Sequence, residues 1–395
     1  MVTSLSRPAA RLEDIKPSPI RVIFDRAAEL SAAGAKIHHL EIGRPDFDSP
    51  DVAKQATAEA LRLGDVHYGP NAGTLELRTA IAEYLRERRG LRYQADGELL
   101  VTVGANEAVF LAIMAFCQPG DEVVVPVPAW AHYLSCIRLA GATPITVPLD
   151  ADRGYRLDRD ALAGAINERT RMVVLCTPNN PTGTVADRSD VDSVAGMLNG
   201  TNALLLSDEI YADLVYGTEH SSPAAHEELY PRTFSIGGFA KAFAMDGWRL
   251  GWLAGPRELI APALRVRQYT TVCPNTFIQS GAVAALRCAR AEAETMRRSF
   301  HARRDAALEV LRGTDRLRVA VPDGAFYLYL SYEPGSAEPA ERFALRLLEE
   351  HHVAVVPGTA FDPQGGTHSL RVSYACSTEE LTEGLRRIIA ALETT

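Results

Sequence analysis

Short apolar runs alternate with helical stretches through residues 99–254, and this alternation limits the chain to a small set of folds. Six runs predict strands, at residues 99–103, 122–125, 172–175, 203–206, 233–236 and 251–254. The runs are continuously apolar, which is typical of strands that are buried on both faces. The pattern therefore predicts an α/β fold with a large domain in which helices flank a mostly parallel sheet.

The segments outside this region predict a second, smaller domain, because 395 residues exceed the usual size of a single core. A charged helix at 291–311 leads to strands at 317–321, 326–330, 353–356 and 369–373 and helices at 341–350 and 378–392, which together indicate an α+β domain. Near the N-terminus, residues 1–19 are expected to be irregular, 22–33 and 51–63 helical and 37–42 extended, and Thr74 to cap a further helix. We expect an N-terminal segment (1–50) that packs with the small domain, a large domain (51–290) and a small C-terminal domain (291–395).

Composition narrows the classes of partner and compartment. The net charge of −9 argues against a nucleic-acid interface, which would be basic. The six cysteines are widely spaced and form no C-x-x-C pair, and several lie in apolar segments, so we expect free, buried thiols and neither disulfides nor a metal site. Residues 1–17 contain no apolar signal-peptide core, and the longest apolar run, 109–117, is too short to span a bilayer. These features predict a cytoplasmic protein without membrane contact.

Lys241 has the least ordinary setting of any charged residue in the chain. Only four of the 41 Lys and Arg residues are lysines, and Lys241 alone follows position 54. It lies in a small, apolar stretch, where a desolvated amine can lose its proton and attack a carbonyl, whereas a guanidinium stays protonated. Lys241 is therefore either a Schiff-base nucleophile or a lysine that extends from a strand end and keeps its amine in water.

Several other residues follow the ends of the expected strands, where parallel sheets bind their ligands. Gly104, Ala105 and Asn106 form an expected turn before a helix at 107–116. Free backbone N–H groups at such a helix start suit a phosphate, although many strand–helix turns look alike. Arg249, shortly after Lys241, is either a second phosphate ligand or a surface arginine.

Three further polar side chains each have two interpretations. Asp208 either caps the next helix or holds a positive charge on a ring nitrogen. Tyr211, one turn later, either reaches the same ring or fills the core. Asn180 is either a turn residue or an amide partner of an anionic or phenolic oxygen, and its bond to Pro181 is a candidate cis peptide.

Trp130 and Arg371 also remain open to two interpretations. Trp130 either belongs to the core or stacks on a flat cofactor ring. Arg371 interrupts the apolar strand at 369–373. It either faces outward at a sheet edge or points inward, where it needs a carboxylate that a substrate can supply.

Taken together, these residues resemble the aspartate-aminotransferase-like family, the class I and II aminotransferases of pyridoxal-phosphate fold type I, over residues 17–392. The matching letters are G-R-P-D-F from Gly43, Tyr68 with Gly73 and E-L-R from Glu76, N-P-T-G from Asn180, D-E-I-Y from Asp208, the segment from Lys241 to G-W-R-L-G, and R-V-S from Arg371. The resemblance implies the fold of that family, with a large-domain sheet of the seven-stranded type, and pyridoxal 5′-phosphate as the cofactor.

The resemblance also implies how the cofactor is held. Lys241 would form a Schiff base with it and move a proton between the substrate and the cofactor. Asp208 would pair with the ring nitrogen, and Tyr211 and Asn180 would bond the phenolic oxygen. The residues that would hold the phosphate or cover the ring are Gly104, Ala105, Asn106, Arg249 and Trp130.

The substrate and the second subunit follow from the same resemblance. Arg371, with Asn180 and the backbone of Gly43, would clamp the substrate carboxylate. Tyr68 would reach the phosphate of a neighbouring subunit, so the active unit would be a homodimer with shared sites. The implied reaction moves an amino group between an L-amino acid and a 2-oxo acid.

Some features depart from the family pattern or leave rival functions open. Gly238 and Ala240 stand where the family has serines, so a hydroxyl ligand of the phosphate is missing, and the role of Arg44 is open.

A lyase, cyclase or oxidase that acts on an amino acid with the same cofactor is the alternative reaction. A nucleotide-binding dehydrogenase would need a G-x-G-x-x-G turn and would leave Lys241 unexplained.

Overall fold

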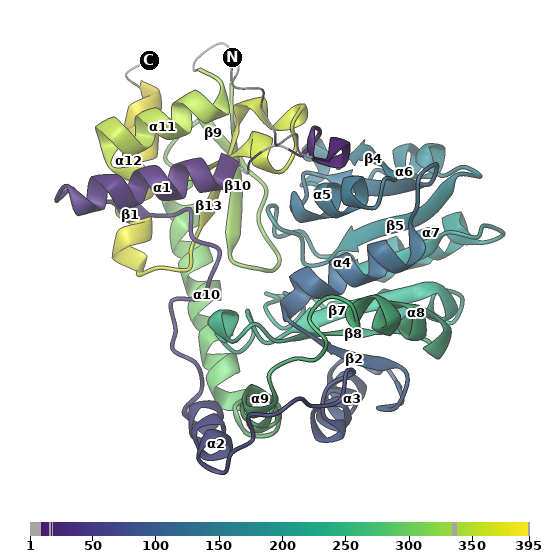
Figure 1. Ribbon diagram of the computed structural model, residues 1–395. Helices are drawn as coiled ribbons and strands as arrows, with labels where there is room; N and C mark the ends of the chain where they lie inside the picture. Colours follow the sequence, from purple (N-terminus) through teal and green to yellow (C-terminus); the bar gives the residue numbers. More distant parts are fainter. Residues whose placement is uncertain (1–8, 16, 18, 334–337, 394–395) are drawn as a thin grey trace, which may run out of the picture.

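The computed structural model of the protein describes residues 9–15, 17, 19–333 and 338–393. Figure 1 shows a large sheet covered by helices beside a smaller group of strands and helices, with the long helix α10 (Arg290–Leu311) running between the two. The expected α/β class, with a mostly parallel sheet and a smaller α+β part, is confirmed.

Seven strands form the large sheet, in the order β2-β8-β7-β6-β5-β3-β4. Every neighbouring pair is parallel except the two pairs that contain β8, which is antiparallel to both β2 and β7. All residues of the central strands β6 and β7 are buried, as the continuous apolar runs predict. The strands are β2 (Leu99–Thr102), β3 (Glu122–Val127), β4 (Thr143–Pro148), β5 (Thr170–Cys176), β6 (Leu204–Asp208), β7 (Thr233–Gly238) and β8 (Gly251–Ala254).

Strand β4, at one edge of the sheet, was absent from the sequence-based expectation. Only Val147 in this strand is buried, and the strand contains Pro144 and Pro148. An edge strand tolerates prolines and exposed side chains because one of its sides makes no ladder hydrogen bonds. A search for continuously apolar strands therefore could not find it.

Alternate residues of the central strands enter two separate apolar cores on opposite faces of the sheet. Val174 and Leu206 pack with residues of α4, α5 and α8, whereas Val173 and Leu205 pack with residues of α6 and α7. The helices of this part are α2 (Asp51–Arg62), α3 (Leu75–Arg89), α4 (Gly104–Phe116), α5 (His132–Leu139), α6 (Arg159–Ala165), α7 (Arg188–Leu198), α8 (Arg257–Arg267) and α9 (Thr276–Cys288).

The smaller part has two sheets, a four-stranded antiparallel sheet in the order β12-β13-β10-β9 and a parallel pair of β1 and β11. Helix α1 (Pro19–Ala32) packs against α11 (Ala340–His351) and β12, so the N-terminal helix joins this part. The remaining elements are β1 (His38–His39), β9 (Leu317–Val319), β10 (Tyr327–Tyr332), β11 (Val353–Ala354), β12 (Val356–Pro357), β13 (Ser369–Ser373) and α12 (Thr378–Glu393).

Several expected boundaries differ from the structure. The extended segment 37–42 shortens to β1, and the strand at 353–356 splits into β11 and β12, which belong to different sheets. Helix α1 begins at Pro19 and a 3₁₀ turn spans Ala10–Leu12, while part of the irregular segment 1–19 lies outside the described residues. Gly104 to Asn106 are the first residues of α4 and not a separate turn. The domain limits at residues 50 and 290 stay predictions.

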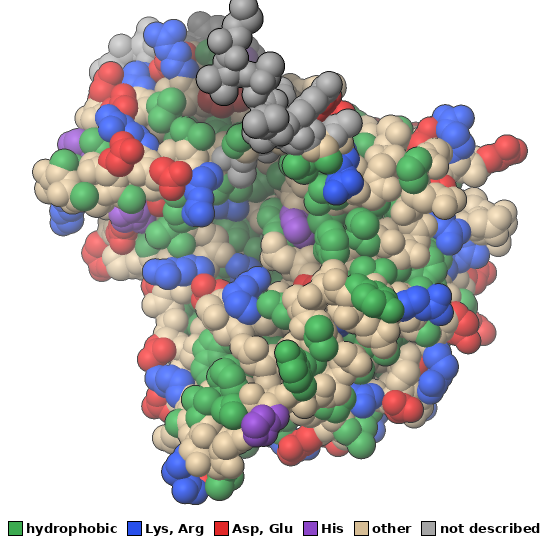
Figure 2. All heavy atoms as spheres, viewed as in Figure 1, with side chains coloured by type: hydrophobic (Ala, Val, Ile, Leu, Met, Phe, Trp, Pro, Cys, Tyr) green, Lys and Arg blue, Asp and Glu red, His purple; other side chains and the backbone are tan. Residues whose placement is uncertain are grey.

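All six cysteines are free thiols, but only Cys117, Cys136 and Cys376 are buried as expected; Cys176 and Cys273 are half-buried and Cys288 is exposed, because it ends α9 at the surface. Over the described residues, no helix is both long enough and apolar enough to cross a membrane. On the face drawn in Figure 2, basic and acidic side chains are interspersed.

A buried ion pair holds the first turn of α4. Arg267 of α8 has no exposed surface, donates a hydrogen bond to the carbonyl of Val101, and places Nη2 3.5 Å from Oε2 of Glu107. Glu107 also accepts hydrogen bonds from the N–H of Val103 (2.6 Å) and the hydroxyl of Thr271. The pair therefore fixes the start of α4 against strand β2 and the loop that follows α8.

Removing one partner should destabilise the fold strongly, because the other charge then stays buried without a counterion. We expect Arg267→Met to lower the free energy of unfolding by about 3–5 kcal/mol, measured by urea denaturation. The matched control Arg265→Met, on an exposed position of the same helix, should change it by less than about 0.5 kcal/mol. Equal unfolding midpoints for the two variants would contradict the structural role of the pair.

Candidate active site

A cavity lies at the carboxyl ends of the parallel strands, between the large sheet and the smaller part of the molecule. It offers about 250 Å³ of room to the centres of water-sized spheres, close to the lower end of the roughly 300–1,000 Å³ typical of ligand sites. Eleven of the twelve expected site residues line it: Gly43, Gly104, Ala105, Asn106, Trp130, Asn180, Asp208, Tyr211, Lys241, Arg249 and Arg371. Tertiary folding thus joins residues that are more than 300 positions apart in the sequence.

Tyr68 is the one expected site residue that does not line the cavity. Its side chain is 89% exposed, on the loop between α2 and α3. Within a single chain it contacts solvent.

The amine of Lys241 points into the cavity just beyond β7. Its Nζ donates a hydrogen bond to the carbonyl oxygen of Gly43 (2.5 Å) and lies 5.7 Å from the ring centre of Tyr211 and 5.6 Å from that of Phe326. Burial lowers the pKa of this amine to about 8, although the Asp246 carboxylate partly opposes the effect. An appreciable fraction of Lys241 is therefore a neutral nucleophile near neutral pH.

Asp208 ends β6 with its carboxylate buried at the floor of the cavity. Its Oδ2 accepts a hydrogen bond from the Tyr133 hydroxyl (2.7 Å), and its Oδ1 accepts one from the N–H of Ile210 (3.1 Å). Burial raises the pKa of Asp208, while the Tyr133 hydrogen bond favours the charged form. Turn residues and no α-helix follow β6, so the interpretation of Asp208 as a helix cap is wrong.

The first turn of α4 and Arg249 form a compact group at one end of the cavity. The side chain of Val103, just before α4, accepts no hydrogen bond from the helix. The first N–H groups of α4 therefore face the cavity without a side-chain cap. Gly104 has a φ of +75°, and a Cβ there would approach Nη2 of Arg249 to 2.8 Å. Arg249 itself donates a hydrogen bond to the carbonyl of Asp246 (2.8 Å). A helix start under a guanidinium is a favourable place for a phosphate.

Arg371 lies at the opposite end and points inward from β13. Its guanidinium donates to the carbonyl of Glu41 (2.7 Å) and to Oδ1 of Asn180 (3.3 Å), and lies 4.5 Å from the ring centre of Tyr327 and 4.9 Å from that of Phe361. Its buried Nε has no hydrogen-bond partner among the described residues. Burial lowers the pKa of Arg371, so a carboxylate ligand would relieve an electrostatic cost.

The remaining expected residues border these groups. The ring centre of Trp130 lies 4.6 Å from that of His132 and 5.5 Å from that of Tyr133, and Trp130 presents part of its surface to the cavity. The hydroxyl of Tyr211 is 2.9 Å from that of Tyr327. The expected cis peptide between Asn180 and Pro181 is present.

The structure shows where the residues that depart from the family pattern lie. A Cβ at Gly238 would come within 3.1 Å of Cα of Gly251 on the neighbouring strand, so the close approach of β7 and β8 leaves little room for a serine there. Ala240 lines the cavity, whereas Arg44 is exposed and lies in a neighbouring hollow.

Sequence reasoning missed several lining residues. Tyr133 lies one helical turn beyond Trp130, a spacing that could have pointed to it. Tyr327 falls in an expected strand, but its hydroxyl meets the site only because β10 pairs with β13. Glu41, Asp246 and the α1 residues Ile20 and Phe24 gave no local signal of any kind.

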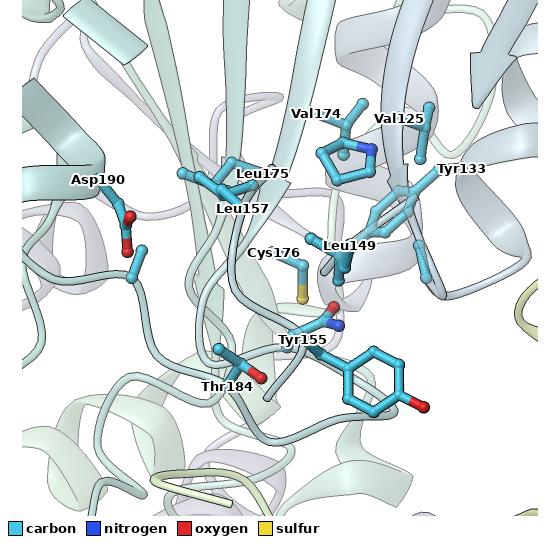
Figure 3. Close-up of a pocket in the computed structure, with 14 residues that line it drawn as sticks. Val125, Tyr133, Leu149, Tyr155, Leu157, Val174, Leu175, Cys176, Thr184 and Asp190 are labelled. Carbon is cyan, nitrogen blue, oxygen red and sulfur yellow. The ribbon is translucent and has the colours of Figure 1, made fainter. Parts of the chain in front are cut away.

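A second, smaller cavity lies behind this floor, and Figure 3 shows Tyr133 and Cys176 facing it. It has about 30 Å³ of room for the centres of water-sized spheres, which is enough for one or two waters. Tyr133 and Cys176 line both cavities, so this region supports the floor of the site.

Comparisons with known proteins agree with this geometry. The family model for aminotransferase class I and II matches residues 35–388. The chain belongs to this family. A bifunctional aspartate aminotransferase and glutamate/aspartate-prephenate aminotransferase of Petunia hybrida is 38% identical over 97% of this chain and 82% of the petunia protein. Aromatic-amino-acid aminotransferase 2 of Thermococcus litoralis is 37% identical over 97% of each chain.

A solved structure extends the likeness to three dimensions. The aspartate aminotransferase from Thermus thermophilus with maleate has a TM-score of 0.92 and 37% identity, and the match covers 98% of this chain and all of that one. Class I and II aminotransferases use pyridoxal 5′-phosphate, and so does this protein. The phosphate end, the buried carboxylate of Asp208, the amine of Lys241 and the unpartnered Nε of Arg371 fit this cofactor and a carboxylate substrate.

The pKa of Lys241 predicts how the cofactor-free aminotransferase reacts with its cofactor. Because the neutral amine is the nucleophile, the rate of attachment of pyridoxal phosphate should rise with pH and level off above about 8. Removing the carboxylate that raises this pKa, by Asp246→Asn, should shift the midpoint to lower pH. Stopped-flow absorbance measures the rate, and borohydride reduction followed by peptide mass mapping locates the attachment.

The control is Asp192→Asn, which removes an exposed carboxylate paired with Arg188 on α7 and should leave the midpoint unchanged. A midpoint near that of an ordinary lysine, or one indifferent to Asp246, would refute the electrostatic description of the site.

Proposed function

We propose that this aminotransferase moves an amino group between an L-amino acid and a 2-oxo acid with Lys241 as its central catalytic residue. The observation that carries the proposal is the amine of Lys241, desolvated and held on the Gly43 carbonyl in the same cavity as Asp208 and Arg371. A nucleophile, a charge partner for a ring and a carboxylate clamp are the groups that this reaction needs.

The chain's own residues would hold the cofactor in one orientation. Lys241 would bond its aldehyde carbon, and Arg249 with the N–H groups of Gly104, Ala105 and Asn106 would bind its phosphate. Asp208 would keep the ring nitrogen protonated, with Tyr133 fixing the carboxylate. Trp130 would cover the ring, and Tyr211 and Asn180 would bind its phenolic oxygen.

The bound cofactor supplies an electron sink for the charge that forms on the substrate carbon when a proton leaves. Displaced from the cofactor by the substrate amine, Lys241 would take the proton from Cα and deliver it to the former aldehyde carbon of the cofactor, which its lowered pKa allows near neutral pH. Arg371 and Asn180 orient the substrate through its α-carboxylate, so that the Cα–H bond faces the amine. Burial of these groups strengthens each charge interaction.

We further propose that the active unit is a homodimer, in the cytoplasm, with sites shared between subunits. The loops at 65–71 and 272–276 touch, since Asn71 donates to the carbonyl of Val272 (2.7 Å) and Thr276 to that of Asp65 (2.9 Å). Large apolar side chains are exposed along these loops and next to them: Leu63, Val66, Tyr68, Tyr269 and Val272. Such a gathering of exposed apolar side chains favours a protein interface, which would carry Tyr68 to the phosphate of the second site.

Amino transfer can be tested by its first half alone. Adding an amino acid to the holoenzyme without an oxo acid should convert the cofactor to pyridoxamine phosphate, followed by absorbance and chromatography. Lys241→Ala should slow this conversion by about 10⁴-fold, because the nucleophile and proton carrier are lost. Lys36→Ala, which removes an exposed lysine, should have no effect. Release of ammonia or carbon dioxide without pyridoxamine phosphate would instead indicate a lyase, cyclase or oxidase.

Shared sites can be tested by mixing two defective variants. Lys241→Ala and Tyr68→Ala subunits should each be impaired as homodimers, but a hybrid has one site with both residues intact. Mixing equal amounts after mild dissociation should restore roughly a quarter of wild-type activity. No gain on mixing, with hybrids verified by native mass spectrometry, would show that Tyr68 does not act in the partner's site.

A further inference from the structure

We propose that the substrate cavity selects amino donors with uncharged, apolar side chains, aliphatic or aromatic, over aspartate and glutamate. This inference rests on the proposed amino-transfer function and names the class of donor. It follows from the charged side chains that line the cavity, from those among them that would bind the cofactor or the α-carboxylate, and from the residues next to Arg371.

Three cationic side chains line the cavity among the described residues: Lys241, Arg249 and Arg371. In the proposed arrangement Lys241 bonds the cofactor, Arg249 binds its phosphate and Arg371 binds the substrate α-carboxylate. No described cation of this chain's lining is left for a second carboxylate on the substrate side chain, and in the proposed dimer the second subunit contributes Tyr68, which is uncharged.

The anionic side chains of the lining also disfavour a second carboxylate on the substrate. Glu41 and Asp246 line the cavity and bind neither the cofactor nor the substrate in the proposed arrangement; Oε1 of Glu41 lies 2.9 Å from Nδ1 of His39, and its buried Oε2 has no hydrogen-bond partner among the described residues. A side-chain carboxylate would enter a desolvated space with negative charges nearby and without a positive partner. Burying such an unpaired charge is unfavourable, so a dicarboxylic donor should bind weakly.

Two apolar residues of α1 border the clamp instead. Ile20 packs against the group formed by Tyr329, Val356, Ala360 and Phe361, and the ring of Phe361 contacts the Arg371 guanidinium (4.9 Å). Phe24 follows one helical turn later, on the same face of α1, and also lines the cavity.

A substrate held by its α-carboxylate on Arg371, with Cα near Lys241, therefore has α1 beside the clamp. An apolar side chain placed against Ile20 and Phe24 gains buried contact. One methylene group in such a pocket changes kcat/KM by roughly 10–200-fold. A whole apolar side chain makes more contact than one methylene group.

The test compares donors and variants of the holoenzyme. For wild type, kcat/KM in the half-reaction should be at least about 10-fold higher for phenylalanine or leucine than for aspartate or glutamate. Phe24→Ala and Ile20→Ala should lower kcat/KM for phenylalanine by about 10-fold or more, while alanine, which is too small to reach α1, should be nearly unaffected. The alanine rate also verifies that each variant is folded.

Two further variants sharpen the result. Val22→Ala changes a residue that is 53% exposed on the same helix and should leave every donor unchanged. Phe24→Arg supplies the missing cation and should raise kcat/KM for aspartate while lowering it for phenylalanine.

Equilibrium binding gives a readout that needs no turnover. 3-Phenylpropanoate should bind the holoenzyme more tightly than maleate, and Phe24→Arg should reverse the order. Preference for aspartate, tighter binding of maleate, or a phenylalanine-to-alanine ratio indifferent to Ile20 and Phe24 would overturn the selectivity. Failure of every donor to yield pyridoxamine phosphate would overturn amino transfer itself, and the binding order would still decide which side chains the cavity accepts.

Discussion

The rest of the site depends on one desolvated amine. Lys241 extends from the end of β7 into a cavity whose walls remove water from Nζ, and the Gly43 carbonyl fixes its direction. Loss of water has the largest effect on the pKa of this amine and lowers it. The carboxylate of Asp246 offsets part of that effect, while Arg249 and Arg371 add to it. The reactivity of Lys241 is therefore a balance that the surrounding charges set.

In the proposed arrangement, the two parts of the molecule contribute different halves of the chemistry. The large sheet supplies the groups that hold a cofactor, because the carboxyl ends of β5, β6 and β7 meet at one edge. The smaller part supplies Arg371 on β13 and the apolar face of α1, which decide how a substrate lies. The hydrogen bond from Arg371 to Asn180 joins these halves across the cavity, whereas the one to the Glu41 carbonyl stays within the smaller part.

Much of the site could be anticipated from local sequence. Asn180, Asp208 and Lys241 each follow a strand whose apolar run is clear, and parallel topology places such positions together whatever the loop lengths. Whether the same residues are a helix cap, a turn residue or a surface charge depended on their neighbours in the folded chain. Asp208 is the clearest case, since only the structure shows a buried carboxylate held by Tyr133 and a turn where a helix was possible.

The sequence by itself determined the α/β class, the strands of the sheet's interior and the unusual setting of Lys241, because apolar runs and an amine in an apolar stretch are local properties. Tertiary structure alone decided which distant residues complete the cavity. Tyr327, Glu41 and the α1 pair Ile20 and Phe24 reach it through strand pairing and helix packing between segments far apart in the chain. The edge strand β4 was likewise decided by its place in the sheet, where pairing on one side suffices to hold a segment with a single buried residue. Local patterns record burial, whereas the identity of a contact partner depends on the whole fold.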